Sequence, residues 1–135
     1  MYISMLRVPS SLPDELEQLV HETIGCCIAV HRALGPGLLE EIYSRALGLE
    51  LTACGIKYER EKPFPVKYRG ELLCRQYLDF VVADQIVLEL KSIEQLAPIN
   101  HAQLLTYMRV AHKRVGLLIN FNVIVLKDGI KRKVL

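Results

Sequence analysis

The sequence predicts an α/β fold in which helices flank a mixed β-sheet. Up to Gly55, apolar residues recur at the three- and four-residue spacing of amphipathic helices. After Gly55 the chain continues as short runs of β-branched and aliphatic residues that are typical of strands. One further helical segment, at about residues 98–111, separates these strands into two groups. Strands that are joined both by tight turns and by a helix form a sheet with antiparallel and parallel pairs.

Two helices are expected before Gly55. The first begins near residues 11–14, where a serine, a proline and an acidic residue occur in the arrangement typical of a helix start. It ends at the LGPG segment of residues 34–37. The second helix runs from about residue 38 to residue 54, and Gly55 ends it. Residues 1–10 are expected to form a loosely ordered lead to the first helix.

Four strands are expected between Gly55 and the third helix. They span residues 56–60, 63–69, 72–82 and 86–92, with a hairpin turn at residues 68–71. A buried strand at residues 115–120 follows the third helix. A short strand pair, at about residues 123–126 and 130–134, ends the sequence. We summarise the order of elements as α-α-β-β-β-β-α-β-β.

The composition is that of one globular domain spanning residues 1–135. Hydrophobic residues make up 51% of the chain, which is enough for a substantial core and excludes a disordered chain. The formal net charge is only +2, so a nucleic-acid site would have to come from local clustering of cations. No apolar run reaches the ~18 residues that a membrane span needs, and no targeting segment is recognisable.

The cysteines follow no metal-binding spacing. Cys26 and Cys27 are adjacent, which suits a disulfide framework poorly, and Cys54 and Cys74 form no CxxC motif with them. We therefore expect four reduced thiols, mostly small residues of the core, in a cytoplasmic protein.

The segment DFVVADQIVLELK, residues 79–91, places charged residues at both ends of an apolar run. Its pattern predicts two short strands joined by a turn near residues 83–85, which would bring Asp79 roughly opposite Glu89. Glu89 and Lys91 are two residues apart, so on a strand they share one face. An acid and a lysine on strands are usually a surface pair, but the apolar residues around this pair favour a central strand. Burying such charges is costly unless they are paired or bound to a cation, and a divalent metal ion explains the set most simply.

A second motif lies at the start of the second helix. The segment GLLEEIY, residues 37–43, fits the signature GxxExxY through Gly37, Glu40 and Tyr43. With the stretches AQLLTYMRVAHKRVGLLINFNV and LKDGIKR, it makes the chain resemble the GxxExxY protein family from about residue 15 to the C-terminus. That family is placed in the PD-(D/E)XK nuclease-like superfamily. The resemblance implies a restriction-endonuclease-like core of order αβββαβ, with the acid and the ELK-type motif on neighbouring central strands.

The resemblance also implies roles for individual residues. Asp79 matches the metal-binding aspartate, Glu89 and Lys91 match the (D/E)XK pair, and Glu40 matches an acid of the preceding helix that binds metal or takes part in catalysis. The implied cofactor is Mg²⁺ or Mn²⁺, a hard cation that prefers oxygen ligands and activates water. Lys91 would orient the attacking water. It would act as a base only with the cation bound, because two neighbouring carboxylates otherwise favour its charged form.

Gln103 and Tyr107 match the QxxxY motif of the RecB-type branch of the superfamily. They are four residues apart on an expected helix and so share one face, from which they would contact a phosphate backbone or brace Lys91. The resemblance thus adds both to the candidate catalytic residues. The ordinary alternative, for Tyr107 as for Tyr43, is a half-buried core aromatic with a satisfied hydroxyl.

Basic residues form two groups in the sequence. The first group alternates with acids, as a solvated face normally does; it contains Lys57, Arg60, Lys62, Lys67, Arg69 and Arg75. The second group is less diluted by acids and could follow a nucleic-acid backbone; it contains Arg109, Lys113, Arg114, Lys127, Lys131, Arg132 and Lys133.

Families of this type often carry a basic residue two positions before the motif aspartate, where this chain has Tyr77. The motif therefore gives no support for a phosphate contact from that strand.

The function that these residues predict is hydrolysis of phosphodiester bonds, in DNA more than in RNA, by a metal-dependent nuclease. The chain has no recognisable sequence-reading module, so specificity would come from a partner, from nucleic-acid structure or from assembly. A homodimer would lengthen the short footprint of so small a core. Two alternatives stay open. One is a catalytically silent nucleic-acid-binding or protein-interaction module that keeps the nuclease fold, and the other is a hydrolase of small phosphoesters.

Overall fold

The computed structural model describes residues 11–135, and the expected lead at residues 1–10 lies outside them. The elements follow in the order α2 (Asp14–Leu34), α3 (Glu40–Ala53), β1 (Tyr58–Tyr68), β2 (Glu71–Val82), β3 (Ile86–Lys91), α4 (Pro98–Ala111), β4 (Val115–Asn120), the 3₁₀ turn η1 (Leu126–Gly129) and β5 (Ile130–Val134). The strands form one sheet in the order β1-β2-β3-β4-β5, and only β3 and β4 are parallel. The predicted α/β fold with a mixed sheet is confirmed.

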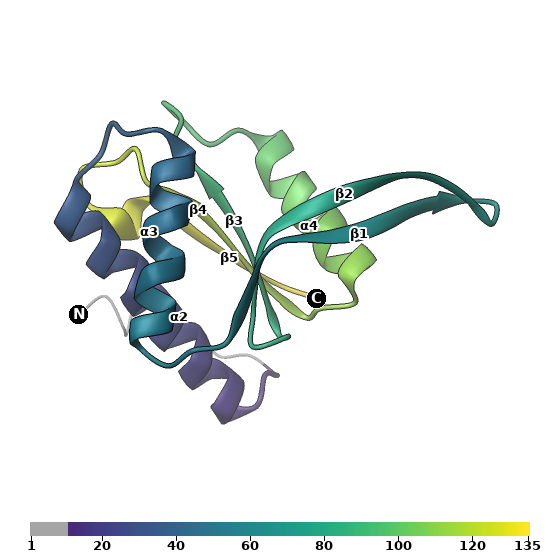
Figure 1. Ribbon diagram of the computed structural model, residues 1–135, viewed down its shortest axis with the longest axis horizontal. Helices are drawn as coiled ribbons and strands as arrows, with labels where there is room; N and C mark the ends of the chain where they lie inside the picture. The colour runs from purple at the N-terminus through teal and green to yellow at the C-terminus, as the bar shows by residue number, and fades with distance from the viewer. Residues whose placement is uncertain (1–10) are drawn as a thin grey trace.

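Helices cover the sheet on both faces. Figure 1 shows α2 and α3 on one side of the sheet and α4 on the other. Each face has its own apolar core: Leu88 and Leu90 of β3 belong to the core under α2 and α3, whereas Val87 belongs to the core under α4. Because side chains of a strand alternate between faces, β3 contributes to both cores, as a central strand should. In the described part of the chain, no helix is both apolar enough and long enough to cross a membrane.

Two sequence predictions about the strands are wrong. Residues 56–60 and 63–69 do not form two strands, because β1 is one strand from Tyr58 to Tyr68 and pairs with β2, with one shift in register between Val66 and Lys67. Pro63 and Pro65 suggested a break, but β1 is an edge strand, where a proline removes no necessary ladder hydrogen bond. The sheet therefore has three strands, not four, before α4.

The second wrong prediction is the strand at residues 123–126. Residues 122–125 form bends between β4 and η1, and only residues 130–134 of the expected pair are a strand. The main-chain polar groups here have partners other than a ladder: the Val123 carbonyl contacts His31 Nε2 at 2.8 Å, and the Asn122 N–H donates to Asn120 Oδ1 at 3.2 Å. The segment covers the end of α2 and does not extend the sheet.

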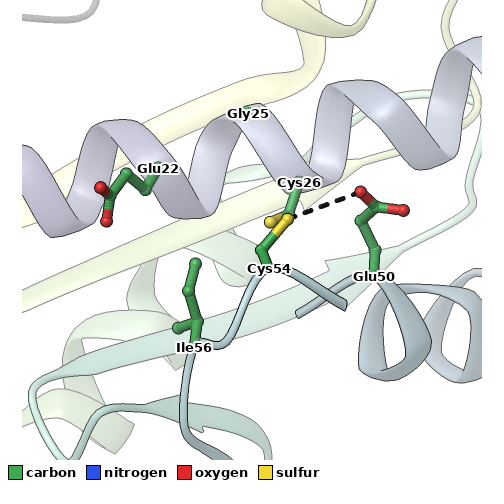
Figure 2. A pocket seen from close by; sticks show the side chains of 6 residues that line it. All are labelled: Glu22, Gly25, Cys26, Glu50, Cys54 and Ile56. Carbon is green, nitrogen blue, oxygen red and sulfur yellow. Dashed lines mark hydrogen bonds between the residues drawn. The ribbon is translucent and has the colours of Figure 1, made fainter. Parts of the chain in front are cut away.

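The cysteines fit the prediction only in part. All four are free thiols, but Cys26 and Cys27 are buried whereas Cys54 and Cys74 are exposed. Figure 2 shows Cys26 of α2 beside Cys54 at the end of α3, where Cys54 Sγ donates to Glu50 Oε2 at 3.7 Å. Burial, with Cys54 as the next cause, raises the pKa of Cys26 to about 12 and keeps it a neutral thiol.

A buried ion pair ties β5 to α2. Arg132 Nη1 donates to Glu17 Oε2 at 2.9 Å, and Nη2 pairs with the other carboxylate oxygen. The side chains of Arg132 and Glu17 are only 10% and 9% exposed. The expectation that Arg132 could follow a nucleic-acid backbone is therefore wrong. Its neighbours Lys133 and Lys131 lie toward His101 of α4. Partial burial of His101 lowers the pKa of that residue most, and the charges of the two lysines lower it further.

We expect Arg132→Met to lower the free energy of unfolding by about 3 kcal/mol, because it leaves the Glu17 carboxylate buried without its cation. Urea unfolding at neutral pH measures the change. Lys131→Met is the matched control, since it removes a cation from the exposed neighbouring position, and it should stay within about 0.5 kcal/mol of the wild type. Equal losses in the two variants would contradict a stabilising role for the ion pair.

Candidate active site

The hairpin of β2 and β3 brings two acidic residues together. Its turn forms where the sequence predicts it, at residues 83–85, with two consecutive residues in the left-handed region. The strands pair in register as far as Phe80 and Leu88. The next residue along each strand, moving away from the turn, is acidic: Asp79 on β2 and Glu89 on β3. The site thus lies where the regular pairing of β2 and β3 ends.

Side chains take over from the main-chain ladder at this point. The Asp79 N–H donates to Glu89 Oε1 at 3.3 Å, and the Leu90 N–H donates to Asp79 Oδ2 at 2.8 Å. Each carboxyl group is therefore held by a main-chain N–H of the opposite strand. The orientation of both acids is fixed by the backbone of the hairpin and does not depend on flexible surface contacts.

Burial gives these acids unusual electrostatics. Glu89 is 4% exposed, and this burial, with the nearby Asp79 carboxylate as the second cause, raises the pKa of Glu89 to about 9. Burial also raises the pKa of Asp79, although the Leu90 N–H and the Lys91 ammonium oppose the shift. Two negative charges are consequently unfavourable here unless a cation balances them.

Glu40 is the third acid of the site and begins α3. Although the residue is exposed, partial burial of its carboxyl and then the charge of Asp79 raise the pKa of Glu40, while Lys91 lowers it. Glu40 therefore interacts electrostatically with both sequence-predicted residues of the hairpin. The structure brings the helix acid to the same region as the strand acids.

Tyr43 positions the start of α3. Its hydroxyl donates to the Gly35 carbonyl at 2.5 Å and accepts from the Leu38 N–H at 3.1 Å, and its ring stacks on Phe121 at 4.5 Å between centroids. Gly37 lies in the same loop with a φ of 96°, a conformation that favours glycine. Tyr43 is fully buried, more than the half-buried aromatic that the sequence suggested. The glycine and the tyrosine of the GxxExxY signature thus fix the loop that leads into Glu40 at the start of α3.

An acidic cavity of about 240 Å³ opens between α3 and the base of the β1–β2 hairpin. It is lined by Glu40, Glu41, Ser44, Glu61 and Asp79. Arg60 partly balances this charge, because it pairs with Glu41 and its Nε donates to Ser44 Oγ at 2.8 Å. Sequence reasoning missed Glu41 and Glu61, which read as ordinary surface acids. Nothing in the local pattern distinguishes them, since only the packing of α3 against β1 brings them to the cavity.

Lys91 is held from the other side, by α4. Its Nζ donates to Gln103 Oε1 at 3.3 Å, and Gln103 Nε2 donates to Tyr107 Oη at 3.1 Å. The Tyr107 ring meets Phe64 edge-on at 5.3 Å. Burial, and then the charge of Glu89, raises the pKa of Tyr107, so its hydroxyl stays protonated. The lysine, the amide and the hydroxyl form a chain of hydrogen bonds from β3 to α4.

The donor atoms of the site suit a hard divalent cation, but the acids do not form a complete ligand set. Among residues 11–135, no group of three His, Cys, Asp or Glu side chains is arranged to hold a metal ion. The buried Glu89 and the half-buried Asp79, which meet with raised pKa values, nevertheless supply the carboxyl oxygens that Mg²⁺ or Mn²⁺ prefers. Such ions keep several water ligands and need only one or two protein carboxylates. Asp79 and Glu89 satisfy that requirement.

Comparison with known proteins agrees with this geometry. The family model described as the PD-(D/E)XK nuclease superfamily matches residues 17–133, which covers most of α2 and the whole of α3, the hairpin and α4. No curated protein and no solved structure matches the chain. The matched segment contains the acid of β2 and the ELK sequence of β3 in the order that names the superfamily. The chain therefore belongs to the PD-(D/E)XK nuclease superfamily and has its restriction-endonuclease-like fold.

Proposed function

We propose that this protein is a nuclease that hydrolyses phosphodiester bonds, in DNA more than in RNA, with Mg²⁺ or Mn²⁺. The observation that supports this most strongly is the meeting of Asp79 and Glu89 at the end of the β2–β3 ladder, with Lys91 alongside. A bound divalent cation would stabilise charge on the scissile phosphate and lower the pKa of a coordinated water. The protein would supply the ligands of the cation and would hold the coordinated water in a fixed orientation.

We assign the metal-binding role to Asp79 and Glu89, with the Leu90 carbonyl as a further oxygen ligand. Glu40 would hold a water ligand or a second ion from the side of the acidic cavity. This assignment draws support from the raised pKa values of all three carboxyls, because a cation removes the repulsion that burial imposes on them.

We propose that Lys91 orients the attacking water and shields the charge that develops on the phosphate. Gln103 and Tyr107 would act as positioning residues, since the hydrogen bonds between them and Lys91 Nζ restrict where the ammonium points.

Gln103 and Tyr107 also support a narrower placement in the RecB-type branch, as the GLLEEIY segment supports the GxxExxY family. Free thiols suit a reducing compartment, and we propose the cytoplasm.

A second candidate function is a nucleic-acid-binding module that keeps the fold but has lost catalysis. One observation favours it: in the described part of the chain, the acids do not form a three-residue metal cluster. The intact Asp79, Glu89 and Lys91 favour the nuclease, because a site that had lost its function would be free to replace the buried Glu89 and the half-buried Asp79 and Lys91 with apolar residues.

A cleavage assay on a panel of substrates separates the candidates. The panel contains supercoiled plasmid, linear duplex, single-stranded and branched DNA, an RNA duplex and a small phosphodiester, each with Mn²⁺, with Mg²⁺ and with EDTA. We expect cleavage of at least one DNA with Mn²⁺ and none with EDTA. Binding without cleavage of any substrate would favour the silent module. Hydrolysis of the small phosphodiester alone would contradict a nuclease.

A further inference from the structure

The outer part of the β1–β2 hairpin, residues 63–77, is named here the arm. β1 and β2 pair out to Tyr68 and Glu71, whereas β2 has β3 as its second neighbour only from Phe80 to Val82. The arm is therefore a two-stranded ribbon without a third strand, and Figure 1 shows it projecting beyond the rest of the molecule. At ~3.3 Å per residue, its strands extend on the order of 20 Å from the sheet.

Apart from Phe64, which is buried against Tyr107 of α4, the arm is largely exposed, and it is basic. Every β2 residue from Glu71 to Tyr77 is exposed. The arm contains one acid, Glu71, and three cations: Lys67, Arg69 and Arg75. Within residues 11–135, none of these three cations forms a salt bridge, whereas Arg60 and Lys62 at the base of the hairpin are both paired with acids. Three unpaired cations on a protruding ribbon attract a polyanion.

One face of the arm leads to the candidate active site. Arg75, Tyr77 and Asp79 alternate along β2, so their side chains leave the strand on the same side. Pro65 lies opposite Arg75, and Lys67 follows two residues later on β1, beyond a shift in register between Val66 and Lys67. At the base of this face Asp79 lines the acidic cavity. Asp79 is four positions from Arg75 on β2, which is ~13 Å along a strand.

We propose that the arm binds the phosphate backbone of the nucleic acid whose scissile bond lies at Asp79, with Lys67 and Arg75 contacting phosphates and Tyr77 contacting a sugar or base between them. This inference rests on the proposed nuclease function. A two-stranded ribbon fits the major groove of duplex DNA, and ~13 Å of strand spans about four nucleotides at ~3.4 Å each. The arm thereby gives a small core the longer footprint that it otherwise lacks.

A second copy of the chain fits the arm less well than a polyanion does. β1 is the edge strand of the sheet, and Pro63 and Pro65 remove two N–H donors from it. Prolines on an edge strand oppose the addition of another strand there. Two arms of the same positive charge would also repel each other. Pairing between copies is therefore an outcome for the experiment to exclude.

Fluorescence anisotropy with a labelled 20-base-pair duplex in EDTA, at several salt concentrations, tests the inference. We expect the double variant Lys67→Ala/Arg75→Ala to bind about 10-fold more weakly. The decrease of log K with log[salt] should also become shallower, with a slope whose magnitude is smaller by about 2. Tyr77→Ala should weaken binding and leave the salt slope unchanged. Arg32→Ala removes an exposed cation of α2 and should change neither quantity. All these substitutions are at exposed positions, so thermal unfolding should report intact folds.

The outcomes distinguish this inference from the proposed function. Weaker binding and a lower salt slope for the arm variants, with Arg32→Ala unchanged, support the inference. Wild-type protein that binds and cleaves DNA while the arm variants keep its affinity and slope overturns the inference and leaves the nuclease intact. Arm variants that dissociate a dimer in sedimentation without losing DNA affinity overturn it in favour of a second copy. Wild-type protein that neither binds nor cleaves any nucleic acid overturns both.

Discussion

Asp79→Asn is expected to lower the rate of DNA cleavage by about 1,000-fold, which corresponds to ~4 kcal/mol of activation free energy. The substitution removes the negative charge that would bind the cation. It keeps the shape of the side chain, and the amide oxygen can still accept from the Leu90 N–H that holds Asp79 Oδ2 in the wild type. The variant should therefore fold normally and fail in catalysis. Single-turnover cleavage with excess enzyme and Mn²⁺ measures the rate.

Asp84→Asn is the matched control for this experiment. It is the same change on the same hairpin, but Asp84 is an exposed residue of the turn that pairs with Lys113. Its cleavage rate should equal that of the wild type. If Asp79→Asn retained the wild-type rate, the cleavage would come from a contaminant or from other residues, and the assignment of Asp79 would be wrong.

The second large effect concerns Lys91. We expect Lys91→Met to cleave DNA about 100-fold more slowly, or ~3 kcal/mol, while it binds Mn²⁺ at least as tightly as the wild type. Methionine keeps much of the aliphatic length but removes the ammonium that donates to Gln103 Oε1 at 3.3 Å. The loss should appear in kcat, because Lys91 is proposed to act on the water and on developing charge. Removing a cation beside two carboxylates does not weaken their attraction for a metal ion.

A pH–rate profile and a control variant complete the test of Lys91. If Lys91 acts on the attacking water, the pH–rate profile of Lys91→Met should differ in shape from that of the wild type. A purely structural role would leave the shape of the profile unchanged. Lys57→Met removes an exposed lysine at the start of the β1 region and should leave kcat unchanged. Wild-type turnover in Lys91→Met would remove this residue from the mechanism.

The hairpin of the site was predictable because its determinants are local. An apolar run divided by a turn at residues 83–85 is enough to place Asp79 near Glu89, since a hairpin's register follows from its turn. The same reasoning located the ends of α2, α3 and α4 to within a few residues. Resemblance to a family added Glu40, which lies far from the hairpin in sequence, and the structure shows its charge interacting with Asp79.

What sequence reasoning missed depends on contacts between distant segments. Glu61 reaches the acidic cavity only because β1 packs beside α3, and Arg132 is buried only because Glu17 of α2 lies under β5. Pro63 and Pro65 suggested a break in a strand whose edge position makes them acceptable. Residues 123–126 have strand-like composition but lie against the end of α2, where His31 contacts the Val123 carbonyl. In each case a long-range contact overrides the local pattern.

The central claim is that Asp79 and Glu89 share a divalent cation, and calorimetric titration of the full chain with Mn²⁺ tests it most directly. Gln in place of Glu89 keeps an oxygen that can accept from the Asp79 N–H but removes a charged ligand. We predict saturable binding to the wild type and to Asp84→Asn, and affinity at least about 10-fold weaker for Glu89→Gln, a loss of ~1.4 kcal/mol or more. Equal affinity of Glu89→Gln and the wild type, or no binding by the wild type, would contradict the account.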